Sequence, residues 1–121
     1  MKDSILREKS YKFALKVIII YKSIVSEKKE YLLGKQLLKS GTAIGALIRE
    51  AEFAQSKADY ISKLSIALKD SNETDYWLSL LEESGLIIQD SYKNLKNYNL
   101  ELIRILVSSI KTAKATKEYK T

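Results

Sequence analysis

The sequence has 121 residues and a net charge of +6, with no cysteine, histidine or proline. This length fits one domain, 1–121, around a single hydrophobic core. Without cysteine there are no disulfides and no thiolate chemistry, and without histidine the commonest general base and metal ligand is missing. The absence of proline favours long, uninterrupted helices.

No stretch of the chain has the composition of a membrane segment. The longest apolar run, 17–21, is far too short to cross a bilayer. The N-terminus lacks the apolar segment of a signal peptide. We therefore expect a cytoplasmic protein without a membrane partner.

The charge is unevenly placed along the chain. Residues 1–29 hold eight Lys/Arg and three Asp/Glu (+5), and residues 30–56 hold three of each. Residues 57–84 hold three Lys/Arg and six Asp/Glu (−3), and residues 85–121 hold seven and three (+4). Both ends of the chain are basic and its third quarter is acidic.

The first predicted helix covers 4–27. Its apolar residues form two adjacent stripes with seven-residue spacing, one through Phe13 and Val17 and the other through Ile18 and Val25. A helix at the surface of a monomer shows a single apolar face. The second stripe therefore predicts a contact with another subunit, and a deep position in the monomer core is the alternative.

The second predicted helix covers 31–55 and carries a stripe of small residues. Each glycine inside a helix costs about 1 kcal/mol relative to alanine, so several on one face need an offsetting gain. Close approach of another helix supplies it, whereas a phosphate-binding glycine loop would need a preceding strand and a turn. We expect a tight helix contact at Ser40, Gly41 and Gly45.

Two further helices are predicted over 57–84 and 90–116. Ser56 is the expected N-cap of the third helix, with Asp59 in the capping-box position, and Gly85 ends that helix. Four helices with short connections give antiparallel neighbours. The prediction is an all-α, up-down-up-down four-helix bundle, and its core is expected to include Phe13, Val17, Leu37, Ile44, Leu64, Leu78, Leu102 and Leu106.

Two stretches of the sequence resemble a known family. They are Leu37–Ala51, with S-G-T-A-I-G-A-L-I-R-E-A, and Asp59–Leu81, with E-T-D-Y-W-L. Both are similar to bacterial four-helix-bundle proteins also known as 23S ribosomal RNA intervening-sequence proteins, which are related to the accessory protein of diversity-generating retroelements. The chain departs from the common pattern at Leu47 and Ala43, where many members carry Asn and Ser.

The resemblance implies a fold, an assembly and partners. The fold is a four-helix bundle, and several members form a barrel-like homopentamer, so a ring-like homo-oligomer is expected here. The retroelement relative binds nucleic acid and a reverse transcriptase through a basic surface. The motif residues implied in helix packing or assembly are Ser40, Gly41, Gly45, Arg49, Glu73 and Trp77.

The polar residues of the motif have a catalytic and a structural interpretation. For catalysis, Glu73 would be a general base, Tyr76 an acid and Arg49 an anion clamp. Antiparallel pairing places Arg49 two to three turns away from Glu73, which favours the structural interpretation, in which Arg49 pairs with a carboxylate and Trp77 anchors a helix or subunit contact. We expect a protein that is not an enzyme.

The acidic residues of the third helix do not form a convincing metal site. Metal sites in helical bundles use Glu-x-x-His motifs, and histidine is absent. A solvated acidic face is favoured for Asp70, Glu73 and Asp75, although Mg²⁺ binding by carboxylates stays open. No metal and no cofactor are expected.

Basic residues from both ends of the chain should meet at one end of the bundle. The start of the first helix lies beside the end of the fourth in this topology, so their cations combine into a surface that attracts phosphates. The alternative is a solvated surface that keeps the protein soluble. The expected contacts with nucleic acid are Arg7, Lys9, Lys12, Lys111, Lys114 and Lys117.

These observations give two functional hypotheses. The first is a non-catalytic oligomer, a pentamer by resemblance, that binds RNA or DNA, with structured RNA favoured, through the basic surface of the first and fourth helices. The second is a scaffold whose basic face docks a protein partner such as a reverse transcriptase or another polymerase.

Overall fold

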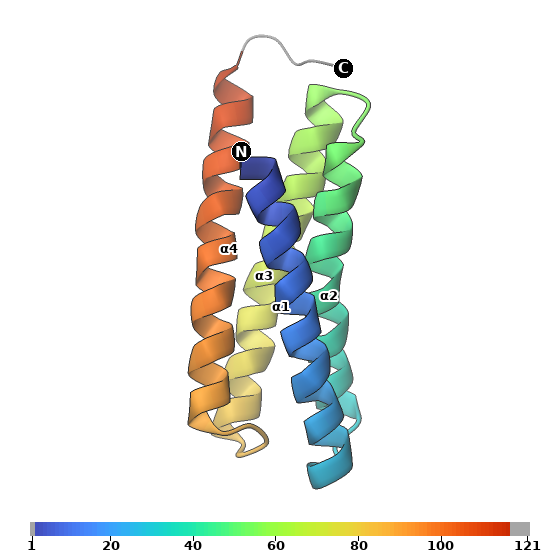
Figure 1. Ribbon diagram of the computed structural model, residues 1–121, viewed down its shortest axis with the longest axis vertical. Coiled ribbons are helices and arrows are strands. Elements are labelled where there is room, and N and C mark those ends of the chain that lie inside the picture. Colours follow the sequence, from blue (N-terminus) through green and yellow to red (C-terminus); the bar gives the residue numbers. More distant parts are fainter. Residues whose placement is uncertain (1, 117–121) are drawn as a thin grey trace.

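A computed structural model describes residues 2–116, with side chains from residue 3 onward. Four α-helices run side by side along its long axis (Figure 1). They are α1 (Lys2–Ser23), α2 (Leu32–Glu52), α3 (Lys57–Glu83) and α4 (Gln89–Ala115), and α1 continues into a π-helical turn, η1 (Ile24–Lys28). Each helix packs against the two that neighbour it around the bundle. The predicted all-α, up-down-up-down bundle is confirmed.

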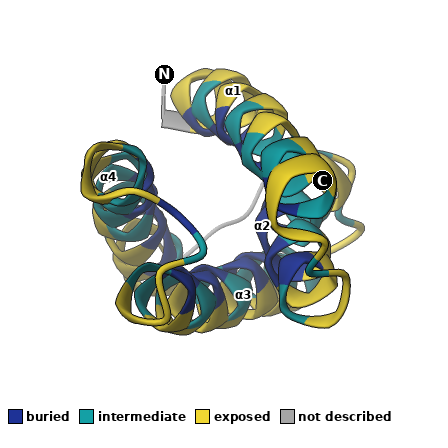
Figure 2. Cartoon of the chain, turned by 90° about the horizontal axis from the view of Figure 1, so that it is seen from below, coloured by how far each residue is buried: buried dark blue, intermediate teal, exposed yellow. Residues whose placement is uncertain are grey.

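The core lies between the four helices and consists of the residues with seven-residue spacing. Seen from one end, the buried side of every helix faces inward (Figure 2). All eight predicted core residues have at most 1% of their surface exposed. The core is therefore the one that the helical periodicity predicts.

The ends of α3 have the predicted local structure. Ser56 accepts a hydrogen bond from the backbone N–H of Asp59 (3.0 Å), which satisfies a donor in the first turn. At the other end Gly85 has a left-handed φ of 78°. Its N–H donates to Glu82 O (3.0 Å), and that of Leu86 donates to Leu81 O (2.8 Å). This pair of bonds is the Schellman motif, which stops the helix and turns the chain toward α4.

Two helix ends differ from the predicted ranges. The first helix ends in the π turn, after which Lys29 takes a left-handed φ of 56°. The second helix ends at Glu52 and not at 55, because Phe53 leaves helical geometry. Neither difference changes the direction in which the next helix runs.

A layer of small polar residues crosses the middle of the core. The Thr74 hydroxyl donates its one proton to Asp70 O (2.7 Å). Thr74 Oγ1 also lies 3.0 Å from Ser40 Oγ, and in this second hydrogen bond the Ser40 hydroxyl is the donor. On the other side of α3, Asn99 Nδ2 donates to the backbone oxygen of Ser71 (2.8 Å). Ser40 of α2 therefore pairs with α3 at Thr74, about one helical turn beyond Ser71.

Candidate functional site

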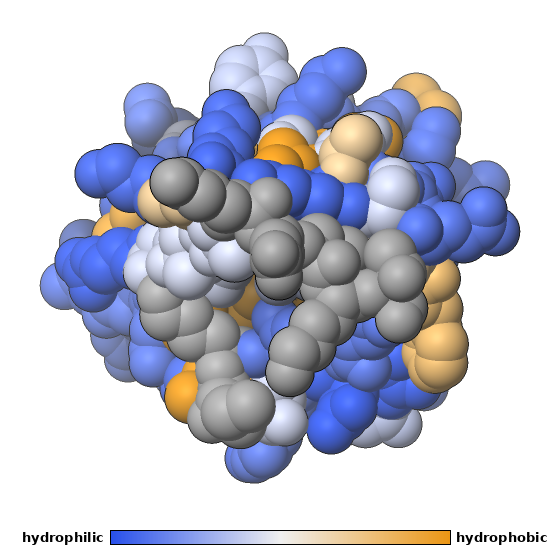
Figure 3. All heavy atoms as spheres, turned by 90° about the horizontal axis from the view of Figure 1, so that it is seen from above, coloured by the Kyte–Doolittle hydropathy of each residue, from blue (hydrophilic) through white to orange (hydrophobic). Residues whose placement is uncertain are grey.

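The two basic segments of the chain meet at one end of the bundle. The start of α1, the end of α4 and the connection between α2 and α3 all lie there (Figure 1). Seen from this end, most visible side chains are hydrophilic (Figure 3). Of the six cations predicted for nucleic-acid contact, Lys117 lies outside the described residues.

The three cations of α1 that were predicted to contact nucleic acid each have a carboxylate partner. Arg7 Nη1 lies 3.0 Å from Glu52 Oε2, Lys9 Nζ 2.8 Å from Glu101 Oε1, and Lys12 Nζ 3.1 Å from Glu8 Oε1. The hydrogen bond that Lys9 donates to Glu101 raises the pKa of Lys9, which favours its charged form. Because each of these three cations faces an anion, the three add little uncompensated charge to this part of the surface.

Three cations in the second half of α4 have no such compensation. Lys111 and Lys114 are exposed, and so is Arg104, seven residues before Lys111 on the same side of the helix. Within residues 3–116 none of the three has a carboxylate within 4.0 Å. Arg104 and Lys111 line one shallow depression together with Ile103, Val107, Ser108 and Thr112.

Arg104 is a candidate contact that the sequence analysis did not include. The contacts predicted for this helix are lysines near the chain terminus, whereas Arg104 lies further inside the helix. The signal was available in the sequence, because residues 104 and 111 are seven apart and therefore share one face. Lys57, at the start of α3, adds another cation at this end and donates to the backbone oxygen of Thr116.

The glycines of the motif lie against α1, but at different distances. A Cβ on Gly41 would be 2.9 Å from Val17 Cγ2, which is closer than real carbon atoms approach. A Cβ on Gly45 would be 3.5 Å from Ser10 O, an ordinary contact. A side chain at Gly41 would therefore clash with Val17, whereas one methyl group at Gly45 would fit in ordinary contact with the backbone of Ser10.

The remaining motif residues do not form one site. Glu50 pairs with Lys63 (3.2 Å), so Arg49 sits at a level about 15 Å along α3 from Glu73, at 1.5 Å per residue. Trp77 Nε1 donates to Glu73 Oε2 (3.2 Å), and its ring meets Tyr76 edge to face. Arg49 does not have the carboxylate partner expected of it among residues 3–116.

The acidic residues of α3 stay apart from one another. In residues 3–116 no group of three or more Asp or Glu side chains is placed to hold a metal ion. Partial burial, and secondly the nearby charge of Glu73, raise the pKa of Asp70. Nor does any helix of the described chain have the length and apolar character needed to cross a bilayer.

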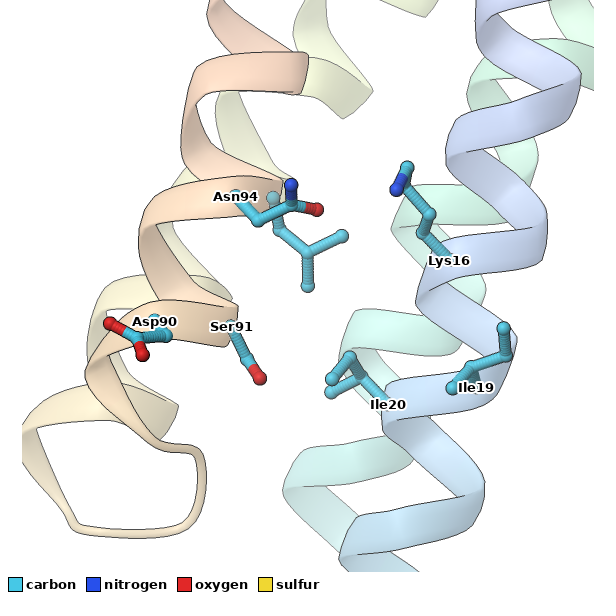
Figure 4. A pocket seen from close by; sticks show the side chains of 7 residues that line it. Lys16, Ile19, Ile20, Asp90, Ser91 and Asn94 are labelled. Carbon is cyan, nitrogen blue, oxygen red and sulfur yellow. The ribbon is translucent and has the colours of Figure 1, made fainter.

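A groove runs between α1 and α4 at the end opposite the basic residues. It is lined by Lys16, Ile19 and Ile20 of α1 and by Asp90, Ser91, Asn94 and Leu95 of α4 (Figure 4). It exists because α1 diverges from α4 toward this end (Figure 1).

The predicted second stripe of α1, through Ile18 and Val25, is partly buried in the single chain. A separate apolar stripe lies beside it, in which Leu15 and Ile19 are 46% and 66% exposed. At Ile19 this exposed stripe leads into the groove beside α4.

Comparison with known proteins assigns a family. The model of the family described as "23S rRNA-intervening sequence protein" matches residues 2–108. A crystal structure of a protein of unknown function from the S23 ribosomal protein family of Bacteroides thetaiotaomicron is 50% identical, with a TM-score of 0.90 over 92% of this chain and 99% of that one. No curated protein matches the sequence. The chain belongs to the 23S rRNA-intervening sequence protein family.

Proposed function

We propose that the protein is a non-catalytic, homo-oligomeric nucleic-acid-binding protein whose main contact surface is the outer face of α4. The observation that carries the proposal is the uncompensated charge of Arg104, Lys111 and Lys114. Such cations release counterions when they meet phosphates, which favours association without sequence readout. The resemblance to the retroelement accessory protein also supports this proposal.

Carboxylate pairing supports a ranking of the candidate contacts by how strongly they should bind phosphate. A cation already paired with a carboxylate must give up that partner, or share it, to bind a phosphate. We therefore expect Lys111 and Lys114 to contribute more than Lys9 and Lys12. RNA is the favoured ligand, and because lysine forms point-charge contacts, binding is expected to depend on backbone charge more than on base sequence.

We also propose that the protein assembles into a ring, a pentamer by resemblance. The exposed stripe of Leu15 and Ile19 supports assembly, because contiguous exposed apolar side chains are typical of interaction surfaces. Light scattering should give five times 13.8 kDa. Ile19→Asp should lower the mass, and Ile66→Asp, on an exposed position of α3 (42%), should not. A wild-type mass of 13.8 kDa at micromolar concentration would refute assembly.

The nucleic-acid proposal is tested by charge reversal at matched positions. Lys111→Glu/Lys114→Glu should weaken binding to every RNA or DNA tested and reduce the slope of log affinity against log salt by about 0.7–0.9 per lost contact. The control is Lys35→Glu/Lys93→Glu, which changes the net charge equally at exposed positions near the other end of the bundle. Equal affinity of both variants, or no binding by the wild type at low salt, contradicts the proposal.

A second function is favoured by the same depression on α4. Ile103 and Val107 line it between Arg104 and Lys111, and apolar side chains among cations suit an acidic protein partner such as a polymerase. Affinity purification from cells separates the two functions. RNA enrichment that is lost in the Lys111→Glu/Lys114→Glu variant supports the first, and one stoichiometric protein partner supports the second.

A further inference from the structure

A groove between α1 and α2 at the basic end of the bundle brings two arginines and a tyrosine together. Arg7, Tyr11 and Arg49 line both of its adjoining hollows, the larger of which measures about 320 Å³. The floor of the smaller hollow includes Gly45 and Ala46. Because Gly45 lines the hollow and has no side chain, a larger residue at this position would fill part of it.

The charge of this groove is not balanced by the described chain. Arg7 is held by Glu52, whose side chain is only 17% exposed, yet Arg7 itself is 47% exposed and keeps donors free. Arg49 is exposed and has no carboxylate partner among residues 3–116. Two guanidinium groups that line one groove repel each other. An oxyanion between them offsets this repulsion and accepts hydrogen bonds from the paired N–H groups of both arginines.

Tyr11 gives the groove an aromatic face. Its side chain is 57% exposed and makes no hydrogen bond or ring contact with the described residues. An exposed ring beside cations is the arrangement with which proteins bind unpaired nucleotides, because every base can stack on a ring while its phosphate meets the charge. A duplex offers no free base face to such a ring.

We propose that this groove binds one unpaired nucleotide of an RNA or DNA strand. Arg7 and Arg49 hold a phosphate, and Tyr11 stacks on the adjoining base. The site deepens the proposed function and rests on it, since it adds a preference for single strands to the charge-driven contact of α4. It uses a different pair of helices, so its residues can be changed without touching Lys111 or Lys114.

The variants follow from the contacts. Arg7 is unsuitable for substitution, because Glu52 would be left partly buried without its cation, and Glu52 Oε1 already lacks a hydrogen-bond partner in the described residues. Arg49→Ala and Tyr11→Leu are suitable, since both side chains are exposed. Arg49→Lys keeps the positive charge and removes the paired N–H donors of the guanidinium group. The matched controls are Lys35→Ala on the same helix and Tyr31→Leu, whose ring is 54% exposed at the other end of the bundle.

The test is fluorescence anisotropy with a labelled 12-nucleotide oligouridylate and a blunt 12-base-pair RNA duplex. Tyr11→Leu should weaken binding to the single strand at least about fivefold, the lower end of the stacking range, and leave duplex affinity unchanged. Arg49→Ala should weaken single-strand binding by a similar factor, with Arg49→Lys between it and the wild type. The two controls should bind the single strand like the wild type.

Each contrary result has a separate meaning. If the wild type binds and Lys111→Glu/Lys114→Glu weakens binding while the groove variants do not, the proposed function stands and the groove is refuted. If the wild type binds neither probe, both fall. If Tyr11→Leu or Arg49→Ala alters the mass in solution at an unchanged melting temperature, the groove is a subunit contact and the nucleotide site is refuted.

Discussion

Replacing Gly41 by alanine tests the closest helix contact in the molecule. The new Cβ would lie 2.9 Å from Val17 Cγ2 and 3.1 Å from Val17 Cγ1, where ordinary contacts begin at about 3.4 Å. Val17 has none of its surface exposed, and its β-branched side chain has one preferred rotamer in a helix, so it cannot turn away. Overpacking of this kind costs about 1–3 kcal/mol. Alanine recovers about 1 kcal/mol of helix propensity, which leaves a net loss of up to about 2 kcal/mol.

Gly45→Ala is the matched comparison on the same helix. Its Cβ would meet only ordinary contacts, so the gain in propensity should dominate and raise stability by up to about 1 kcal/mol. Thermal unfolding followed by circular dichroism should therefore separate the two variants by at least about 1 kcal/mol, or about 4 °C for a chain of this size. Equal melting temperatures, or a more stable Gly41→Ala variant, would refute the packing argument.

A double-mutant cycle with Val17→Ala identifies the atoms responsible. Val17→Ala alone removes buried methyl groups and should destabilise the protein. If the Val17 methyl groups are what the Gly41→Ala side chain meets, the double variant should be more stable than the sum of the single changes predicts, with a coupling of about 0.5–3 kcal/mol. Additive effects would place the strain elsewhere.

Three further predictions concern backbone conformation and pH. Gly85→Ala should lower the free energy of unfolding by about 1 kcal/mol, because φ is 78° and no atom lies near enough to the new Cβ to compensate; an unchanged melting temperature would contradict this. Lys29→Gly should raise it by up to about 1 kcal/mol, since it relieves a left-handed lysine while adding freedom to the unfolded chain, and a lower melting temperature would count against that account. Burial raises the pKa of Asp70 above its value in the unfolded chain, so its ionisation opposes folding and its contribution to stability is lost as pH rises through the folded-state pKa. Asp70→Asn should therefore melt higher than the wild type at pH 7, and this difference should vanish below pH about 3.9, whereas a difference that persists in acid would refute the assignment.

The sequence predicts most of the fold because the fold depends on local patterns. Seven-residue spacing decides which side of each helix is buried, and Phe13 and Leu102 are fully buried as that spacing requires. Ser56 and Gly85 mark the ends of α3 through bonds to residues only a few positions away. Such signals lie within single segments of the chain, so no knowledge of tertiary contacts is needed to use them.

The candidate site is less predictable because charge compensation depends on contacts between helices. Arg7 and its partner Glu52 are 45 residues apart, and Lys9 and Glu101 are 92 apart. Counting basic residues by segment makes the two ends of the chain look alike. Only the packing of the helices shows that Arg7 and Lys9 are paired while Lys111 and Lys114 are not.

The glycines illustrate the same limit within one motif. Gly41 and Gly45 lie one turn apart on the same face, and the sequence offers no reason to separate them. Their difference arises because α1 presents the branched side chain of Val17 to one and the backbone of Ser10 to the other. The first glycine permits tight packing, and the second leaves a hollow beside Arg49.

The two proposed properties of the protein, assembly and nucleic-acid binding, strengthen each other physically. Three unpaired cations on one α4 helix form too few phosphate contacts for tight binding at physiological salt, since non-specific affinity grows with the number of contacts. In a closed ring the same face recurs once per subunit, and a strand held by one subunit meets the next at high effective concentration. The apolar stripe through Leu15 and Ile19 lies on α1, so a subunit contact there leaves the outer face of α4 available. It follows that a variant such as Ile19→Asp, although it changes no cation on α4, should lose far more affinity for a long RNA than for one that spans a single subunit.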